Sequence, residues 1–512
     1  MSTYIKELSR KEKKSLAVLG EELAVLQRSI IAEKGSVCIL IDGWENSGKG
    51  EVISRLTQEL DPRYYEVVEM PSHWEAKHSH RLFRSFWAAL PRKGHITIFD
   101  RSIYNGILHN PEISEKTLDG RLEDLTAFIR MLTDDGMIVI KLFLQISHDE
   151  QKNRIRAIEK TEFKKEILST LDYDQEKRYA DFADHFAEII SRTNRLYSQW
   201  HMIAMDDMKD GCRAAMSIVK DELTAGLDAF RSLQALNAAS REEKTTAEIA
   251  SYPSAFPANL TLEVAEQDYR QRLKELQEKA RRLAYMMYIC HIPTICVFEG
   301  MDAAGKGGSI KRLTKEIDPR SYTIATTAAP TAEELSFHYL RRFMTKIPEP
   351  GKITICDRSW YGRVMVERVE RLAAPREWRR AYEEINAMER FLKHIGVNFM
   401  KFFLVIDSEE QLRRFNDRQN TPEKQWKITD EDWRNRDKWD LYNDAYQEMF
   451  YRTSTSTAPW IIVEGNVKYH ARLKVLHTFV TQSERKLRSY EENHAKEFNW
   501  KNLWNEYETI GT

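Results

Sequence analysis

The sequence predicts an α/β protein in which a parallel β-sheet, covered by helices on both faces, occurs twice in tandem. Three observations predict this fold. The chain has 512 residues, which is longer than one hydrophobic core usually supports. Short apolar segments alternate with amphipathic ones, as in sheets whose strands are buried on both faces. The sequence also matches itself at a fixed offset. We therefore expect two three-layer αβα sandwiches.

The internal match is specific. At an offset of 257, residues 43–65 align with 300–322 and 13 of the 23 positions are identical; residues 94–104 align with 351–361 at 8 of 11 positions. Beyond this point the offset becomes 260, which aligns Trp200 with Trp460. Two repeats are too few for a solenoid. We expect an N-terminal domain at 1–231, a linker rich in Ala, Ser, Thr and Pro at 232–260, and a C-terminal domain at 261–512.

The elements follow in order along the second repeat. A long amphipathic helix is expected at 264–287, and the apolar run "TICVFEG" at 294–300 predicts a buried strand that leads into a Gly-rich loop and a helix. Further strands are expected at 352–357, 398–407 and 459–465, where short apolar runs recur. Helices are expected at 332–344, at 377–396 and after 465. A charged helical stretch separates the last two strands.

Composition limits the class of protein. The chain is 42% hydrophobic and 31% charged, with 78 basic and 79 acidic residues, which is typical of a soluble globular protein. Near-zero net charge argues against a nucleic-acid binder. No apolar run approaches the roughly 20 residues that cross a bilayer, and the charged start lacks the apolar core of a signal peptide. We therefore expect a cytoplasmic protein without a membrane partner.

The cysteines lack paired or metal-ligand spacing and are expected to be reduced core residues: Cys38, Cys212, Cys290, Cys296 and Cys356.

The stretch "FEGMDAAGKGGSIKRL" at 298–313 nearly spells a phosphate-binding loop. Its backbone N–H groups would surround a phosphate at a helix N-terminus, and Lys306 supplies a positive charge. The Ser or Thr that usually helps to hold Mg²⁺ is replaced by Gly307, so the carboxylate of Asp302 is the natural substitute. Asp357, at the end of the strand 352–357, would approach the same metal. Each feature alone has a simpler explanation, such as a tight turn or a helix cap. Together, in sheet order and present twice, they predict a P-loop kinase-like fold that binds phosphate.

Longer motifs carry a family resemblance. "GMDAAGKGG", "DRSWYGRVMVERVE", "KFFLVIDSEEQLRRF" and "WKITDEDWRNRDKWDLYNDA" resemble the second family of polyphosphate kinases, and the match covers nearly all of 264–490. Two such domains in one chain resemble the class II members. The resemblance implies transfer of the terminal phosphate of inorganic polyphosphate to AMP, which gives ADP, with Mg²⁺ as the cofactor and Mn²⁺ as the alternative. It also implies a lid at about 411–440.

The same resemblance assigns roles to residues of the second repeat. Catalytic roles are implied for Asp302, Lys306, Asp357 and Arg358, of which Asp302 and Asp357 would hold the metal. The remaining residues would contact phosphate or polyphosphate: Gly300, Ala303, Ala304, Gly305, Gly307, Gly308, Lys311, Arg363, Arg414, Arg418, Lys427, Arg434 and Arg436. A row of cations suits a polyanion, because affinity comes largely from neutralised phosphates and released counterions. For any single lid residue, an ordinary solvated charged helix is an equally good explanation.

The first repeat departs from this pattern. It keeps Gly43, Gly48, Lys49, Asp100 and Arg101, but Glu45 stands where the second repeat has Asp302. The other losses are larger, because six cationic positions become Ser54, Gly106, Ile158, Ile167, Asp174 and Glu176. We therefore expect a degenerate partner domain that is catalytically weak or inactive.

Three hypotheses remain open at this point. The favoured one is polyphosphate-dependent phosphorylation of AMP, with ADP or GDP as alternative acceptors. The second is an ATP-dependent nucleoside monophosphate kinase, against which the missing Ser or Thr after Lys306 argues. The third is a phosphate-sensing scaffold without activity. The sequence does not decide polyphosphate chain length, and it leaves a homo-oligomer open.

Overall fold

The computed structural model of the chain describes residues 15–70, 79–242, 252, 254–256, 259–494 and 502. The chain divides into two compact units. The first comprises Met1–Ala239 with Pro330–Arg341, and the second comprises Ser240–Ala329 with Arg342–Thr512. The boundaries expected from the sequence, 1–231, 232–260 and 261–512, stay a prediction. Within the expected linker, residues 243–251, 253, 257 and 258 lie outside the described residues, as do residues 1–14 of the charged start.

The first unit contains a five-stranded sheet of β1, β2, β3, β4 and β5. Its elements, in chain order, are α1 (Leu16–Glu33), β1 (Ser36–Gly43), α2 (Lys49–Thr57), β2 (Tyr65–Glu69), α3 (Ser79–Ala89), β3 (His95–Asp100), α4 (Asn105–Leu108), α5 (Glu115–Asp134), β4 (Ile138–Gln145), α6 (His148–Glu159), α7 (Lys164–Ile167), α8 (Thr170–Lys177), α9 (Tyr179–Thr193), β5 (Trp200–Ala204) and α10 (Met208–Glu242). The end of α10 extends into the expected linker.

The second repeat forms the same series. Its elements are α11 (Glu266–Ile289), β6 (Thr294–Gly300), α12 (Lys306–Leu313), η2 (Pro319–Ser321), β7 (Tyr322–Thr326), η3 (Glu334–Ser336), α13 (Arg341–Met344), β8 (Ile353–Asp357), η4 (Trp360–Val364), α14 (Val366–Val369), α15 (Pro375–His394), β9 (Asn398–Val405), α16 (Ser408–Asn420), η5 (Pro422–Lys427), α17 (Asp430–Asp437), α18 (Trp439–Thr453), β10 (Trp460–Glu464) and α19 (Lys468–Asn493). The stretch 332–344, expected as one helix, instead forms η3 and the short α13, separated by non-helical residues.

Both sheets are parallel and have the same topology. The strand orders are β2-β3-β1-β4-β5 and β7-β8-β6-β9-β10. The registers also agree: Ile41 pairs with Asp100 in the first sheet, and Phe298 pairs with Asp357 in the second. In each sheet the central strand therefore ends beside the strand that carries the aspartate, so loop and aspartate meet at the carboxyl edge of the sheet. The predicted duplicated α/β fold is confirmed.

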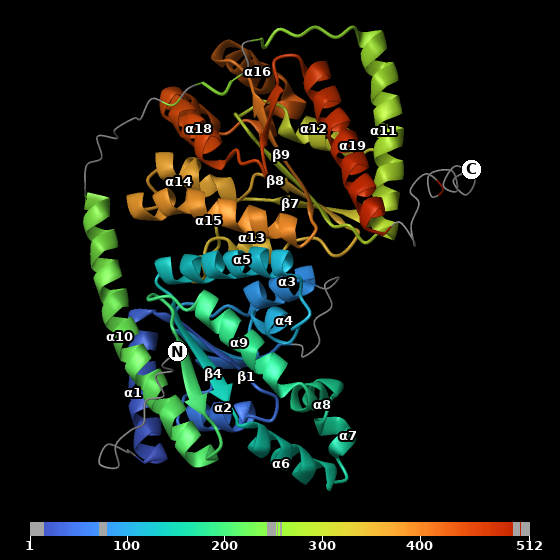
Figure 1. Cartoon of the computed structure of the whole chain (residues 1–512). Helices are drawn as coiled ribbons and strands as arrows, with labels where there is room; N and C mark the ends of the chain where they lie inside the picture. Colours follow the sequence, from blue (N-terminus) through green and yellow to red (C-terminus); the bar gives the residue numbers. More distant parts are fainter. Residues whose placement is uncertain are drawn as a thin grey trace. The chain divides into compact units, whose positions relative to one another are not determined.

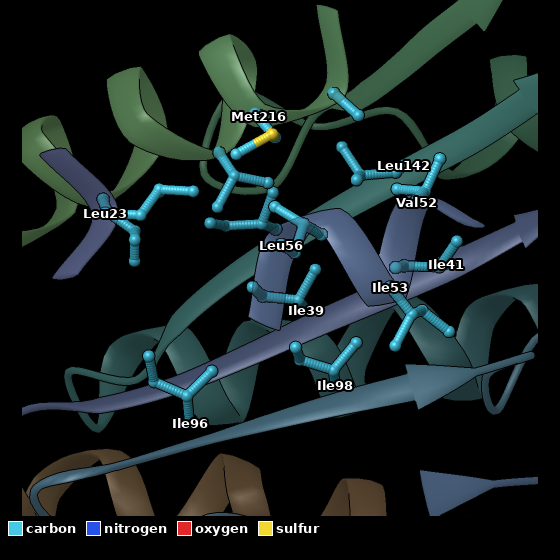
Figure 2. Close-up of a cluster of buried hydrophobic side chains, with 14 of the residues drawn as sticks. Leu23, Ile39, Ile41, Val52, Ile53, Leu56, Ile96, Ile98, Leu142 and Met216 are labelled. Carbon is cyan, nitrogen blue, oxygen red and sulfur yellow. The ribbon is translucent and has the colours of Figure 1, made fainter. Parts of the chain in front are cut away.

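Helices cover both faces of each sheet. In the first unit, α1, α2 and α10 pack on one face, where alternate residues of β1 contribute Ile39 and Ile41 to a buried apolar cluster. Figure 2 shows Ile39 near Leu56 of α2, and Ile41 near Val52 and Ile53 of the same helix. In the second unit, α11 and α19 lie side by side on one face, and α15 covers the other (Figure 1). These layers form the predicted three-layer sandwich.

The cysteines fit a further expectation. All five cysteines are free and buried, as predicted for core thiols. Burial raises the pKa of the Cys290 thiol to about 12, so this side chain stays protonated. Across the described part of the chain, we find no helix that combines the length and apolar character needed to span a bilayer.

Candidate active site

The loop between β6 and α12 begins and ends at glycines with left-handed backbone. Gly300 has φ +146° and Gly305, the N-cap of α12, has φ +106°. A Cβ at Gly300 would lie 2.4 Å from the carbonyl oxygen of Leu404 in the neighbouring strand. This close backbone approach explains why glycine stands at this position. Between the glycines, Ala303 and Ala304 are buried, so the turn is a packed part of the unit.

Lys306 lies at the first position of α12, with its side chain folded back over the loop. Its Nζ donates to the carbonyl oxygens of Gly300 at 2.6 Å and Met301 at 3.3 Å. Burial lowers its pKa, and the carboxylates of Asp302 and Asp357 oppose that shift. The ammonium therefore lies in the field of both carboxylates at the N-terminus of a helix. Two of the glycines assigned to phosphate binding, Gly307 and Gly308, are in the first turn of the same helix.

Arg358 follows Asp357 at the end of β8 and turns toward the loop. Its backbone is left-handed, with φ +63°, and its N–H donates to the carbonyl of Phe298. Its Nη2 lies 3.6 Å from Oδ1 of Asp302. Burial alone would lower the pKa of Arg358, but Asp302 and the other nearby carboxylates raise it, so the guanidinium stays charged. The structure thus brings all four predicted catalytic residues to one edge of the sheet.

Glu299 is a buried acid beside this cluster that sequence reasoning missed. It lies on β6 directly before Gly300, and the Ser359 hydroxyl donates to its Oε1 at 2.7 Å. Burial raises the pKa of Glu299, while Ser359, Lys306 and Arg358 lower it. An acidic residue inside the apolar run "TICVFEG" was the available signal, because buried acids need a partner.

Asn435 is a second residue that sequence reasoning missed. It lies on α17, and its amide Nδ2 donates to Oδ2 of Asp302 at 2.9 Å. Gln411 of α16 donates to the backbone carbonyl of Asp302 at 3.2 Å. Both contacts tie the predicted lid to the loop. No sequence signal identified Asn435, because its partner is 133 residues away.

Arg414 lies behind the loop. Its side chain is 4% exposed, and its guanidinium donates to the carbonyls of Ala303, Gly465 and Asn466 and to Glu410. All of these partners are groups of the protein itself. Arg414 was assigned to phosphate because of the row of lid cations; this geometry makes it a support of the loop.

The other predicted phosphate contacts fall into two groups. Arg436 donates to the carbonyl of Ser408 and to Gln411, and Arg363 pairs with Glu367 at 3.0 Å, so both have protein partners. Arg418 is half-buried, and one of its N–H groups donates to the carbonyl of Lys427. Three side chains are exposed to solvent: Lys311, Lys427 and Arg434. Of these four cations, Lys311 lies on α12, and the other three belong to the predicted lid: Arg418 on α16, Lys427 on η5 and Arg434 on α17.

In the equivalent loop of the first unit, the acidic side chain is already bound by cations of the same unit. Glu45 accepts two hydrogen bonds from Arg101, at 2.8 and 3.2 Å, and lies 3.6 Å from Lys49. Burial alone would raise the pKa of Glu45, but these cations lower it to about 2. The carboxylate is therefore ionised and already neutralised by cations of the same unit. Trp44, buried in this loop, stacks on Tyr179 with ring centroids 4.1 Å apart.

The carboxylates of the second unit fit a magnesium ion. Within the described residues no group of three or more His, Cys, Asp or Glu side chains is arranged to hold a metal. Mg²⁺ does not require one, because it keeps several waters and commonly takes one or two carboxylates together with substrate phosphates. Asp302 and Asp357, which both act on Lys306, provide such a pair. Among the residues that the structure describes, no arginine makes a bidentate contact with either of them like that of Arg101 with Glu45.

A comparison with models of protein families identifies the family of the chain. The model of polyphosphate kinase 2 matches residues 6–227 and 263–491, which cover both repeats. The chain belongs to the polyphosphate kinase 2 family. The family model therefore matches the chain twice, as the internal repeat requires.

Individual relatives agree over nearly the whole chain. The polyphosphate:AMP phosphotransferase of Pseudomonas aeruginosa is 39% identical over 462 residues, which cover 86% of this chain and 89% of that protein. The polyphosphate:AMP phosphotransferase of Acinetobacter johnsonii is 35% identical, covering 94% and 98%. A crystal structure of a polyphosphate kinase 2 from Pseudomonas aeruginosa superposes with a TM-score of 0.77 at 35% identity, covering 94% of this chain and 97% of that one. The double-unit fold is thus shared by a solved member of the polyphosphate kinase 2 family.

Proposed function

We propose that the protein transfers the terminal phosphate of inorganic polyphosphate to AMP, forming ADP, at the loop of the second unit. Two relatives that align over most of the chain are polyphosphate:AMP phosphotransferases. The observation that carries the assignment to the second unit is the state of the loop carboxylate. Asp302 accepts from a neutral amide and lies 3.6 Å from an arginine, whereas Glu45 is bound by two N–H groups of Arg101.

The chemistry requires positioning and charge, and no side-chain nucleophile. The acceptor is a phosphate oxygen of AMP, already anionic at neutral pH, which must approach the terminal phosphorus in line with the leaving oxygen. Lys306 and Arg358 supply positive charge where charge builds up on the transferred group. Asp302 and Asp357 would hold a magnesium ion, which would supply further positive charge for the phosphate groups. The lid helices α16 and α17 would exclude water from the transfer.

The polyanionic donor requires cations beyond the loop. The solvent-facing Lys311, Lys427 and Arg434, with the half-buried Arg418, are available for this role in the second unit. At the equivalent positions the first unit has Ser54, Ile167, Asp174 and Ile158, one of which reverses the charge. A polyphosphate chain would therefore bind the second unit in preference, with an affinity that falls steeply as salt rises.

A paired substitution tests this assignment. In the main assay, purified protein with Mg²⁺ and AMP is given polyphosphate or ATP as the donor, and the ADP formed is measured. In parallel reactions, ADP or GDP replaces AMP as the acceptor. We expect ADP formation from AMP with polyphosphate only. Lys306→Ala should abolish it, while the matched Lys49→Ala should leave most of the turnover.

Each outcome of this assay discriminates. ATP as the preferred donor would make the protein a nucleoside monophosphate kinase, and the absence of turnover with every donor would favour a phosphate-sensing scaffold. An equal loss in folded Lys49→Ala protein, judged by circular dichroism, would mean that both loops work and would refute the assignment to the second unit.

A further inference from the structure

The lid and the loop of the second unit meet at Asn435. Its amide donates to Oδ2 of Asp302, while the other carboxylate oxygen, Oδ1, faces Arg358. Both oxygens of Asp302 are therefore held by side chains from elements far apart in sequence. The amide is neutral, so it orients the carboxylate without cancelling its charge.

The orientation of the Asn435 amide follows from its partner. An ionised carboxylate only accepts hydrogen bonds, so the end of the amide that faces Asp302 is the nitrogen. The Tyr442 hydroxyl lies 3.1 Å from the other end, Oδ1 of Asn435. Tyr442 also lies 3.3 Å from Glu370, which pairs with Lys438 of the same lid region. Asn435 is thus part of a connected polar network that joins α17 and α18 to the end of α14.

The first unit has an amide at the equivalent position but uses it differently. Gln175, which aligns with Asn435 at the offset of 260, accepts from the backbone N–H of Glu45 at 2.8 Å and donates to Nδ1 of His109 at 3.0 Å. Gln175 thus contacts the backbone of Glu45, whereas Arg101 binds the Glu45 carboxylate. Phe182 stands at the position of Tyr442, which contacts Asn435 in the second unit. Within the described residues, only the second unit combines a lid amide with the loop carboxylate.

We propose that Asn435 is a positioning residue for phosphoryl transfer: its amide latches the lid onto Asp302 and sets the orientation of that carboxylate while leaving it anionic. The proposal rests on the proposed function of the second unit. The latch keeps α17 over the loop during transfer, so that AMP and not water accepts the phosphate. When water enters, one water molecule is consumed for each inorganic phosphate released from the donor.

Three variants test the latch. Asn435→Ala removes the amide, and Asn435→Asp places a carboxylate against Asp302, which repels it. The control is Asn416→Ala, an exposed asparagine on α16 of the same lid. The first measurement is the rate of tryptic cleavage in the lid at Lys424 and Lys427, whose flanking residues none of these substitutions changes. The second is the ratio of inorganic phosphate released to ADP formed.

We expect lid cleavage to be fastest in Asn435→Asp, intermediate in Asn435→Ala and slowest in the wild type and Asn416→Ala. The phosphate-to-ADP ratio should rise in the same order, and kcat with AMP should fall about ten-fold or more in Asn435→Ala, as expected when a hydrogen bond to a charged group is lost. Wild-type cleavage and coupling in Asn435→Asp would overturn the proposal. If the wild type forms no ADP, the proposed function fails, while the cleavage rates still decide whether the latch exists.

Discussion

Replacing Arg414 separates two roles that a lid arginine can have. As a support of the loop, it satisfies the carbonyls of Ala303, Gly465 and Asn466 and pairs with Glu410 at 2.5 Å. Arg414→Ala removes all four interactions from a side chain that is 4% exposed. At about 1 kcal/mol for each hydrogen bond, the loss is about 4 kcal/mol, within the range of about 3–5 kcal/mol for breaking a buried ion pair.

Arg414→Lys provides the decisive comparison. Lysine keeps the charge but cannot reach three diverging carbonyls with one ammonium group, so we expect a loss of about 2 kcal/mol and a large loss of activity. For a unit of this size, about 4 kcal/mol in Arg414→Ala corresponds to a fall in melting temperature of roughly 10 °C. Scanning calorimetry measures the transitions, and ADP formation is assayed on the same samples.

The first unit supplies the matched control. Arg154 donates to the carbonyls of Asn46, Ser47 and Met205 and pairs with Glu150, so it supports the first loop in the same way. Arg154→Ala should destabilise the protein comparably and leave ADP formation largely intact. If Arg414→Lys has wild-type stability but binds polyphosphate more weakly, with a shallower salt dependence, Arg414 contacts the donor and our reasoning is refuted.

Three further substitutions have defined outcomes. Gly300→Ala should cost at least about 3 kcal/mol of stability and abolish activity, because its Cβ would lie 2.4 Å from the Leu404 carbonyl at φ +146°; an active, stable variant would contradict the loop geometry. Lys401 is 0% exposed, and its ammonium is bound to Glu389 at 2.7 Å. Glu389→Ala leaves that buried charge without its carboxylate, so it should lower the free energy of unfolding by about 3–5 kcal/mol in chemical denaturation. An unchanged free energy of unfolding would contradict a stabilising role of this ion pair. Burial lowers the pKa of His109 to about 3, so this side chain stays neutral when folded while the unfolded chain binds a proton below about pH 6.5. The stability that neutral His109 contributes is therefore present above pH 6.5 and is lost as the pH falls, by up to about 2 kcal/mol at pH 5. His109→Gln should remove this part of the pH dependence in thermal melts. Identical pH profiles of the variant and the wild type would show that His109 titrates normally.

Much of the fold followed from local sequence patterns. The strands β6, β8, β9 and β10 were predicted within about two residues at each end, because buried parallel strands are short apolar runs. The edge strand β7 was missed, as was β2 in the first unit. Both consist of exposed and half-buried residues and carry no apolar run, so pairing with the neighbouring strand is what makes them strands.

The functional site divides in the same way. The sequence by itself determined the duplication, the loop and the meeting of Asp302, Lys306, Asp357 and Arg358, because these residues follow adjacent parallel strands whose carboxyl ends share one edge of the sheet. The position of each residue at the end of its own strand was sufficient for this.

Only the tertiary structure decided how charged side chains are used. In the structure, Arg414 donates to a carbonyl of the loop, and Asn435 donates to Asp302, which is 133 residues away in the sequence. In the first unit, Arg101 binds Glu45. From the sequence, Arg414 was predicted to contact phosphate, and Glu45 was identified as the counterpart of Asp302. The physical reason is that packing fixes the direction of a long polar side chain and therefore determines which group it contacts. That packing depends on elements that are distant in the chain.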